Sequence, residues 1–173
     1  FDGMADEIER DMRQLEANAA ELESRQQGLR KFSLAIEHSP VSVVITDAAG
    51  AIEYVNAKFT EVTGYALKET LGRQPSILKS EHMPDKVYAD LWQTLQCGRE
   101  WQGELLNRKK NGELFWEDTR IAPLKDAQGR ISHYVAVKKD ITQRKRAEEA
   151  ISNHGMELER RVAERTRRLQ ESK

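Results

Sequence analysis

The sequence predicts an α+β domain with a five-stranded antiparallel sheet, short helices on one face of the sheet, and a helical arm at each end. Two β-rich runs, 41–47 and 51–55, lie on either side of a glycine-containing turn. Three more β-rich runs follow residue 100, and turn sequences separate them. Both ends of the chain are highly charged and carry apolar residues at intervals of seven.

Helical segments separate the second strand from the third. Asn56 precedes a short helical run and is a natural N-cap, because its side chain can accept backbone N–H groups. Gly64 is suited to end this helix. Residues 84–97 carry apolar side chains at helical spacing, and Gly98 follows as a stop signal.

Two turns join the last three strands. Asn111-Gly112 indicates a two-residue hairpin, in which both turn positions take positive φ. Residues 126–129 begin with Asp and end with Gly, which predicts the second turn. The fifth strand ends at Asp140-Ile141-Thr142 and runs directly into a charged helix.

The N-terminal arm has a heptad repeat. Its main positions are Ile8, Leu15, Leu22, Leu29 and Ile36. The complementary positions are Ala5, Met12, Ala19, Gln26 and Ser33. Such a repeat over about four heptads is typical of a parallel coiled coil, so we predict a parallel homodimer. The alternative is one amphipathic helix that packs on the sheet.

The C-terminal arm has a looser repeat, formed by Ile141, Ile151, Leu158, Val162 and Leu169. A glycine, Gly155, stands within it, and glycine costs a helix about 1 kcal/mol relative to alanine. A weak seam suits an element that a signal must shift. Gly155 is alternatively a neutral surface position or a true break.

Composition limits the classes of function. The chain has 173 residues and a net charge of −1, with 33% charged residues, which suits one domain with solvated arms. The balanced charge predicts no nucleic-acid partner, and no apolar run approaches the roughly 20 residues that span a bilayer. Cys97 is the single cysteine, which fits a reducing cytosol. No phosphate-binding loop, nucleophile elbow or metal-ligand spacing appears, so we expect neither catalytic residues nor a metal site.

The order of these elements, with the runs VITD, YVN, TGY and DIT, resembles a PAS domain over residues 33–142. The resemblance implies a non-catalytic sensory module, preceded by a signalling helix at 1–32 and followed by a coiled-coil linker at 143–173. Residues 1–8 resemble the end of a HAMP linker, which implies the cytoplasmic part of an inner-membrane receptor. Residues 157–166 resemble linkers that precede histidine kinase or diguanylate cyclase domains, as in two-component systems.

The predicted pocket residues of such a domain are Trp101, Asn107, Glu117, Tyr134 and Lys138. The light-oxygen-voltage subfamily of PAS domains contacts its flavin with three polar residues of the sheet. This chain resembles the subfamily at the first of these positions, Asn107. At the other two positions it has Glu117 and Lys138, which depart from the subfamily. Because side chains alternate along a strand, all five should face inward. An inward Glu117 and Lys138 should pair or bind a polar ligand, since separate charges are costly in a pocket.

The resemblance leaves several cofactors open. Pro75 stands where the photoactive cysteine of the light-oxygen-voltage subfamily would be, which excludes a cysteinyl–flavin adduct at that position. FAD is the best candidate, because the redox-sensing PAS domains of nitrogen-fixation regulators have similar sheet residues. Haem is disfavoured, since His82 is a lone loop histidine. A direct Glu117–Lys138 pair would instead favour an empty pocket or a small ligand.

The predicted signal route leaves the domain along the fifth strand. Val135 and Val137 should face outward, under a cover from the N-terminal arm or its dimer mate. Asp140 should hold the strand-to-helix turn, and Thr142 should cap the outgoing helix. We therefore expect a module that senses a small ligand, redox state or upstream helix movement and relays it through a dimeric coiled coil to a kinase or cyclase domain. The alternative is a dimerisation and spacer module with an empty pocket.

Overall fold

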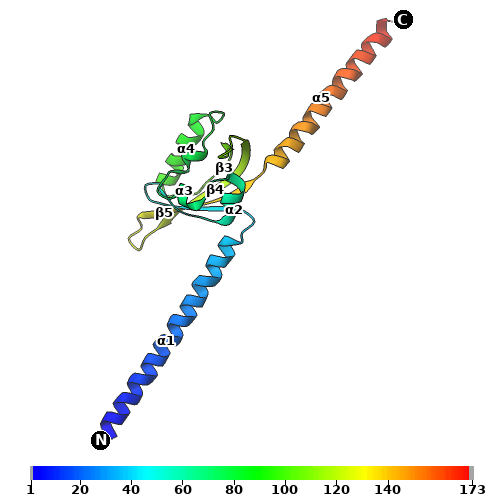
Figure 1. The fold of residues 1–173 in the computed structure, drawn as a ribbon. Coiled ribbons are helices and arrows are strands. Elements are labelled where there is room, and N and C mark those ends of the chain that lie inside the picture. Colours follow the sequence, from blue (N-terminus) through cyan, green and yellow to red (C-terminus); the bar gives the residue numbers. More distant parts are fainter. Residues whose placement is uncertain (1, 172–173) are drawn as a thin grey trace. The chain divides into compact units, whose positions relative to one another are not determined.

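The structure, a computed structural model, describes residues 2–171 (Figure 1). The chain divides into two units after Pro40. The first unit contains one long helix, α1 (Asp2–Glu37). The second contains the sheet, the helices that cover it, and the C-terminal helix α5 (Thr142–Glu171).

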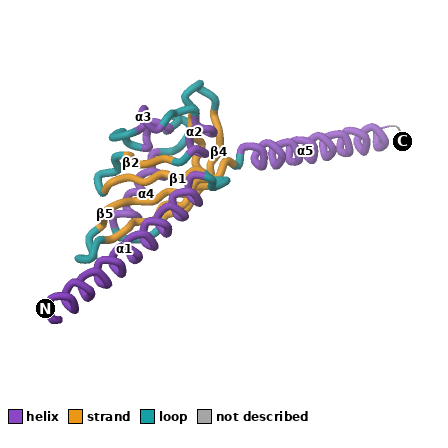
Figure 2. Tube along the Cα trace, turned by 60° about the horizontal axis from the view of Figure 1, so that its bottom comes forward, coloured by secondary structure: helices purple, strands orange, loops and turns teal. Residues whose placement is uncertain are grey.

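The sheet has five antiparallel strands, as predicted, in the order β2-β1-β5-β4-β3 (Figure 2). Their bounds are β1 (Ser42–Asp47), β2 (Ile52–Val55), β3 (Trp101–Arg108), β4 (Leu114–Lys125) and β5 (Ile131–Asp140). The last strand in the sequence, β5, is therefore the central strand of the sheet. It is also the strand that continues into α5, so the centre of the sheet is connected directly to the C-terminal arm.

Helices cover one face of this sheet and form the core with it. They are α2 (Ala57–Thr63), α3 (Leu67–Thr70), the 3-10 turn Pro75–Leu78 and α4 (Asp85–Gln96). Phe59 of α2 packs with Val44 of β1, and Leu95 of α4 packs with Leu105 and Tyr134 of the sheet. Alternation along the strands explains this arrangement, because every second side chain points to the same face.

The predicted helix ends are confirmed. Asn56 caps α2, since its Oδ1 accepts the N–H of Phe59 at 3.1 Å. The same oxygen accepts the N–H of Val43 at 2.9 Å, which ties the cap to β1. Gly64 ends α2 with a φ of 79°, and Gly98 follows α4 with a φ of 72°. Glycine suits both places because it adopts positive φ without a steric penalty.

The turn between β3 and β4 corrects one prediction. Gly112 donates its N–H to the Lys109 carbonyl at 2.9 Å, and its φ is 89°. Among residues 2–171 only glycines have positive φ, so Asn111 does not take part in the predicted two-residue turn. Asn111 instead accepts the N–H of Glu113 through its side chain at 3.0 Å. The hairpin is confirmed, but the chain reverses through a longer turn that needs positive φ only at Gly112.

Both arms are continuous helices. Four seam positions of α1 are more than half exposed within their unit: Ile8, Leu15, Leu22 and Leu29. This helix runs on to Glu37, beyond the predicted arm at 1–32. Helix α5 passes through Gly155 without interruption, so this glycine is not a break. Within residues 2–171, no helix combines the length and the apolar character needed to cross a membrane.

Candidate sensory cavity and helix junction

A cavity of about 120 Å³ lies between the inner face of the sheet and α4. Its side chains come from β1, β3, β4 and β5, from α4, and from the segment 74–79. Apolar residues supply most of the wall: Val44, Leu91, Trp92, Leu95, Leu105, Ile121 and Ala136. The two charged residues that line it are both lysines, Lys79 and Lys138. Such a mostly apolar cavity with a few polar groups is the usual form of a small-molecule site.

The Glu117 carboxylate is the centre of a buried polar cluster beside this cavity. Its Oε2 accepts Asn107 Nδ2 at 2.7 Å and Lys138 Nζ at 3.2 Å. Glu117 is 0% exposed, Asn107 3% and Lys138 5%. Of the two predicted outcomes, a direct pair or a polar ligand between the residues, the structure has the direct Glu117–Lys138 pair. Loss of either partner would leave a buried, uncompensated charge.

The structure separates the predicted pocket residues into two groups. Asn107, Tyr134 and Lys138 line the cavity, and Glu117 contacts two of them without itself lining it. Trp101 faces inward as predicted and is buried beside α4, but it is not part of the cavity wall.

Two contacts explain the position of Trp101. Its indole N–H donates to Asp90 Oδ2 of α4 at 2.9 Å. Its ring lies over Gly103, where an added Cβ would come within 2.6 Å of the ring. Trp101 therefore fastens α4 to β3, and Gly103 has to be a glycine for the ring to fit.

Two residues outside the predicted pocket set, Lys79 and Tyr88, also line the cavity. Lys79 Nζ bonds Asp85 Oδ1 at 2.8 Å and lies 4.5 Å from the centroid of the Tyr88 ring. The hydrogen bond raises the pKa of Lys79 and lowers the pKa of Asp85. Burial raises the pKa of the Tyr88 hydroxyl. Because Asp85 is exposed, water competes strongly for this ion pair.

Three buried polar atoms at or beside the cavity have no hydrogen-bond partner among the described residues. They are Tyr88 OH, Glu117 Oε1 and Thr119 Oγ1. Tyr88 and Thr119 line the cavity. Buried polar groups in proteins are nearly always satisfied by protein, water or a ligand, so these atoms indicate a polar occupant.

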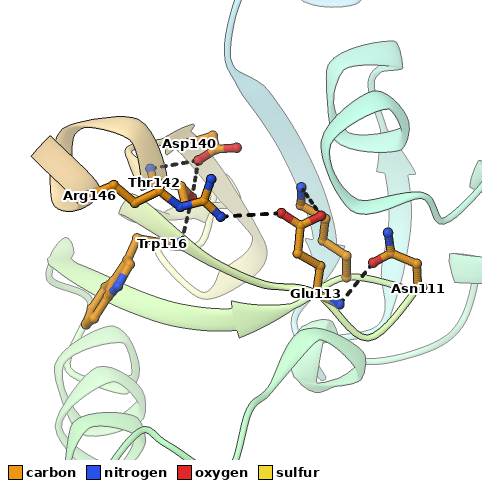
Figure 3. Close-up of polar contacts among 7 residues, drawn as sticks. Asn111, Glu113, Trp116, Asp140, Thr142 and Arg146 are labelled. Atoms are coloured by element: carbon orange, nitrogen blue, oxygen red, sulfur yellow. Dashed lines mark hydrogen bonds and ion pairs between the residues drawn. The ribbon is translucent and has the colours of Figure 1, made fainter.

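The junction between β5 and α5 is held by side-chain hydrogen bonds to β4 (Figure 3). Asp140 Oδ1 accepts the backbone N–H of Thr142 at 2.9 Å and its hydroxyl at 2.6 Å. The Thr142 oxygen in turn accepts the N–H of Trp116 at 3.0 Å. Asp140 holds the turn through backbone hydrogen bonding, as predicted. Thr142 differs from the predicted cap, because it begins the helix and its hydroxyl binds the neighbouring strand.

Ionic contacts add a clamp at the same place. Glu104 of β3 bonds both Arg144, at 2.6 Å, and Lys145 of α5. Both hydrogen bonds lower the pKa of Glu104, and the bond from Lys145 has the larger effect. Lys145 Nζ also lies 4.9 Å from the centroid of the Trp116 ring. We call Glu104, Arg144 and Lys145 the helix clamp. It fixes the first turn of α5 to the sheet.

The outward orientation of Val135 and Val137 is confirmed. Their neighbours Tyr134, Ala136 and Lys138 line the cavity, and Val137 is 41% exposed. Val137 and Val135 pair with Val43 and Ile45 of β1, and the outer face of the sheet is therefore apolar at its centre. What covers this face stays a prediction.

The family model of the PAS fold matches residues 30–141 of this chain. The chain belongs to the PAS family. The match ends at the last strand, so it takes in the whole sheet and both sides of the cavity. As a PAS domain this part of the protein is a non-catalytic sensory module of signalling proteins.

Relatives of this PAS domain are found in several signalling proteins. The chain is 35% identical over 139 residues to the nitrogen fixation regulatory protein of Klebsiella oxytoca, covering 80% of this chain and 28% of that protein. It is 34% identical over 93 residues to the aerotaxis receptor of Escherichia coli, covering 54% and 18%. It is 29% identical over 114 residues to the blue-light-activated histidine kinase of Brucella anthropi, covering 64% and 23%. The chain thus spans less than a third of each of these relatives.

Solved structures of light-oxygen-voltage domains share the fold. One, described as a flavin-analogue study of the light-oxygen-voltage domain mechanism, superimposes with a TM-score of 0.61 and 28% identity, over 73% of this chain and 96% of that one. An RNA-binding light-oxygen-voltage receptor gives a TM-score of 0.66 with 23% identity, over 72% and 36%, which supports the fold alone. In this PAS domain Pro75 lines the cavity.

Proposed function

We propose that this PAS domain senses a signal in its cavity and relays it through α5 to an output domain. The observation that carries the proposal is the position of β5. Lys138 of β5 lines the cavity, and Asp140, two residues further along the same strand, holds the start of α5. Two residues of a strand span only about 7 Å, so a change at the cavity wall lies next to the junction.

A second connection runs through β4. Glu117 contacts Lys138 inside the domain, and its neighbour Trp116 contacts the junction outside it. Trp116 donates its N–H to Thr142 and accepts the N–H of Ile141 through its carbonyl at 2.9 Å. A shift of Glu117 that follows the state of the cavity would therefore move the backbone that holds α5. Rigid strands can transmit small shifts because packed cores deform in discrete steps.

The proposed output is a histidine kinase or cyclase domain, reached through a parallel dimeric coiled coil. Relatives that share this PAS domain include histidine kinases, which supports the first of these. The exposed seam of α1 and the weak, glycine-containing seam of α5 suit a dimer in which the second seam changes its packing. An inner-membrane receptor would place this domain on the cytoplasmic side.

Flavin is the cofactor that the relatives suggest, and the cavity does not fit it in this conformation. About 120 Å³ is well below the roughly 300–1,000 Å³ of sites for drug-sized ligands, and the isoalloxazine system has three fused rings. The amide of Asn107 already donates to Glu117. FAD would therefore need α4 or the segment 74–79 to move outward. An absorbance spectrum of the purified protein between 300 and 700 nm tests directly whether flavin is bound, because flavin absorbs strongly there.

A cavity-filling substitution tests whether the domain senses or only spaces. Ala136→Leu should fill the cavity from β5, whereas Val137→Leu adds no group to it and serves as the matched control. We expect Ala136→Leu to change the hydrogen exchange of the Lys145 amide, which bonds the Ile141 carbonyl at 3.0 Å. The Ile52 amide, bonded to the Arg73 carbonyl at 2.8 Å, reports global stability. If the two amides change in parallel, the cavity is not coupled to α5 and the spacer function is favoured.

A further inference from the structure

The cavity has a polar end and an apolar end. Strand register places Lys138 directly beside Thr119, and both line the cavity. Ala136 comes next along β5, followed by Tyr134, whose ring meets that of Trp92 edge-on at 6.0 Å. Along β5 the wall therefore changes from hydrogen-bonding groups to aromatic rings over four residues.

The polar end offers hydrogen-bond donors that lack acceptors. An ammonium group carries three N–H donors, and Lys138 uses one of them on Glu117. The Thr119 hydroxyl is 0% exposed and has no partner among the described residues. An occupant of this end should therefore present an acceptor. A methyl or other apolar group there would leave both donors without an acceptor.

The charge balance favours a neutral acceptor over an anion. Glu117 already neutralises Lys138, and neither side chain is more than 5% exposed. The other lysine of the wall, Lys79, is paired with Asp85. A ligand carboxylate would bring a second anion to this buried pair, and an uncompensated buried charge is costly. A carbonyl oxygen can accept from Lys138 and Thr119 without adding charge.

The volume limits the ligand to one ring. An engineered apolar cavity of 150 Å³ in another protein is known to hold benzene. The cavity here, about 120 Å³, is of that order. Its apolar end is lined by aromatic side chains, against which a planar ring packs favourably.

We propose that the cavity binds a neutral, single-ring compound that directs a carbonyl oxygen at Thr119 and Lys138. The ring would lie against Ala136 and beside the Tyr134–Trp92 aromatic pair. This inference rests on the proposed sensory role of the cavity and names the chemical class that it would detect.

Three probes of similar shape test the proposal by calorimetric titration of the full chain. Benzamide has a ring and a neutral carbonyl, benzoate has a ring and a carboxylate, and toluene has a ring without an acceptor. We expect saturable binding of benzamide and at least tenfold weaker binding of the other two. If benzoate binds as tightly as benzamide, the proposal that the ligand is neutral is overturned. If toluene binds as tightly as benzamide, the proposal that the ligand needs an acceptor is overturned. No binding by any probe, or a flavin bound in the purified protein, would overturn the proposed size.

Thr119→Val removes the hydroxyl and keeps the shape of the side chain. It should weaken the binding of benzamide roughly fivefold, which is the effect of one hydrogen bond. The affinity for toluene should not change. Thr94→Val on α4, outside the cavity wall, is the control. Thr119→Ser keeps the hydroxyl and should bind benzamide as the unaltered chain does, whether or not the valine variant folds. Equal benzamide affinity in the serine and valine variants, or loss of binding in the serine variant, would overturn the role of Thr119.

The proposed function and this inference fail in different ways. If benzamide binds as expected but the exchange of the Lys145 amide does not change, the ligand class holds and the relay fails. If Ala136→Leu alters that exchange and no probe binds, the relay holds and the ligand class is overturned.

Discussion

Individual polar residues shape the cavity of this PAS domain. The Glu117–Lys138 pair is buried, and its geometry follows from strand alternation, which is why the sequence could predict it. The same rule gives the inward orientation of Trp101 but not its hydrogen bond to α4. Its indole reaches Asp90, which comes from a helix, and such a contact depends on how α4 packs on the sheet. Lys79 was not among the predicted pocket residues, because it lies outside the regular strands and reaches the cavity through an isolated β-bridge to Asn107.

The buried pair gives a stability prediction. Lys138→Ala would leave Glu117 charged and without its cation, so we expect a loss of roughly 3–5 kcal/mol in the free energy of unfolding. Lys139→Ala, the exposed neighbour on the same strand, should have little effect. A double change, Glu117→Leu with Lys138→Met, should recover much of the loss because no buried charge remains. Denaturant unfolding measures all three. An unchanged Lys138→Ala variant would mean that the pair is not buried.

At the scale of elements, the sequence predicted the helices and strands well because caps, turns and periodicity are local signals. Asn56 and Gly64 bound α2 as expected. The prediction of a two-residue turn at Asn111 was wrong, because the longer turn needs positive φ at only one residue, Gly112. The helix clamp could not be predicted, since Glu104 and Arg144 are forty residues apart and meet only when β3 and α5 are in place.

The helix clamp predicts a pH effect on α5. The pKa of Glu104 is lowered in the folded protein from an ordinary value of 4.5. The ion pairs of Glu104 therefore stabilise the start of α5 fully above pH 4.5. This stabilisation is lost as the pH falls through the lower pKa of the folded state. We therefore expect amides in the first turn of α5 to exchange faster, relative to that of Ile52, as the pH falls below 4.5. Glu104→Gln should show the faster exchange already at neutral pH, and Glu100→Gln, before β3, should not. Equal exchange in Glu104→Gln and the unaltered chain at neutral pH would show that the clamp does not hold the helix.

Gly155 gives a second prediction for α5. A Cβ at this position would meet nothing within 4 Å, so alanine fits without strain. Gly155→Ala should stabilise α5 by about 1 kcal/mol and raise the melting temperature of the arm seen by circular dichroism. Gly28→Ala in α1, where a Cβ is equally free, should strengthen the other arm and leave α5 unchanged. A Gly155→Ala variant with a less stable α5 would indicate that the glycine has a packing role.

On the scale of the whole molecule, we expect the arms to make a parallel dimer. Leu22 is 65% exposed in α1 and lies at the centre of the heptad seam. Leu22→Lys would bury a charge at each contact and should weaken association by several kcal/mol. Glu21→Lys, one position away from the seam, should leave association nearly unchanged. Light scattering of the full chain at micromolar concentration distinguishes the outcomes, and a monomeric unaltered chain would contradict the dimer.

A signal that leaves the cavity through Asp140 should be lost when this side chain is removed, so the decisive measurement is the output of the full-length receptor with Asp140→Ala. The matched control is Asp126→Ala, which removes a similar turn-holding carboxylate at the other end of β5, where Asp126 Oδ1 accepts the N–H groups of Gln128 and Arg130, each at 2.9 Å. We predict that Asp140→Ala folds and gives the same output with and without stimulus, whereas Asp126→Ala still responds. An Asp140→Ala receptor that responds fully would contradict this prediction.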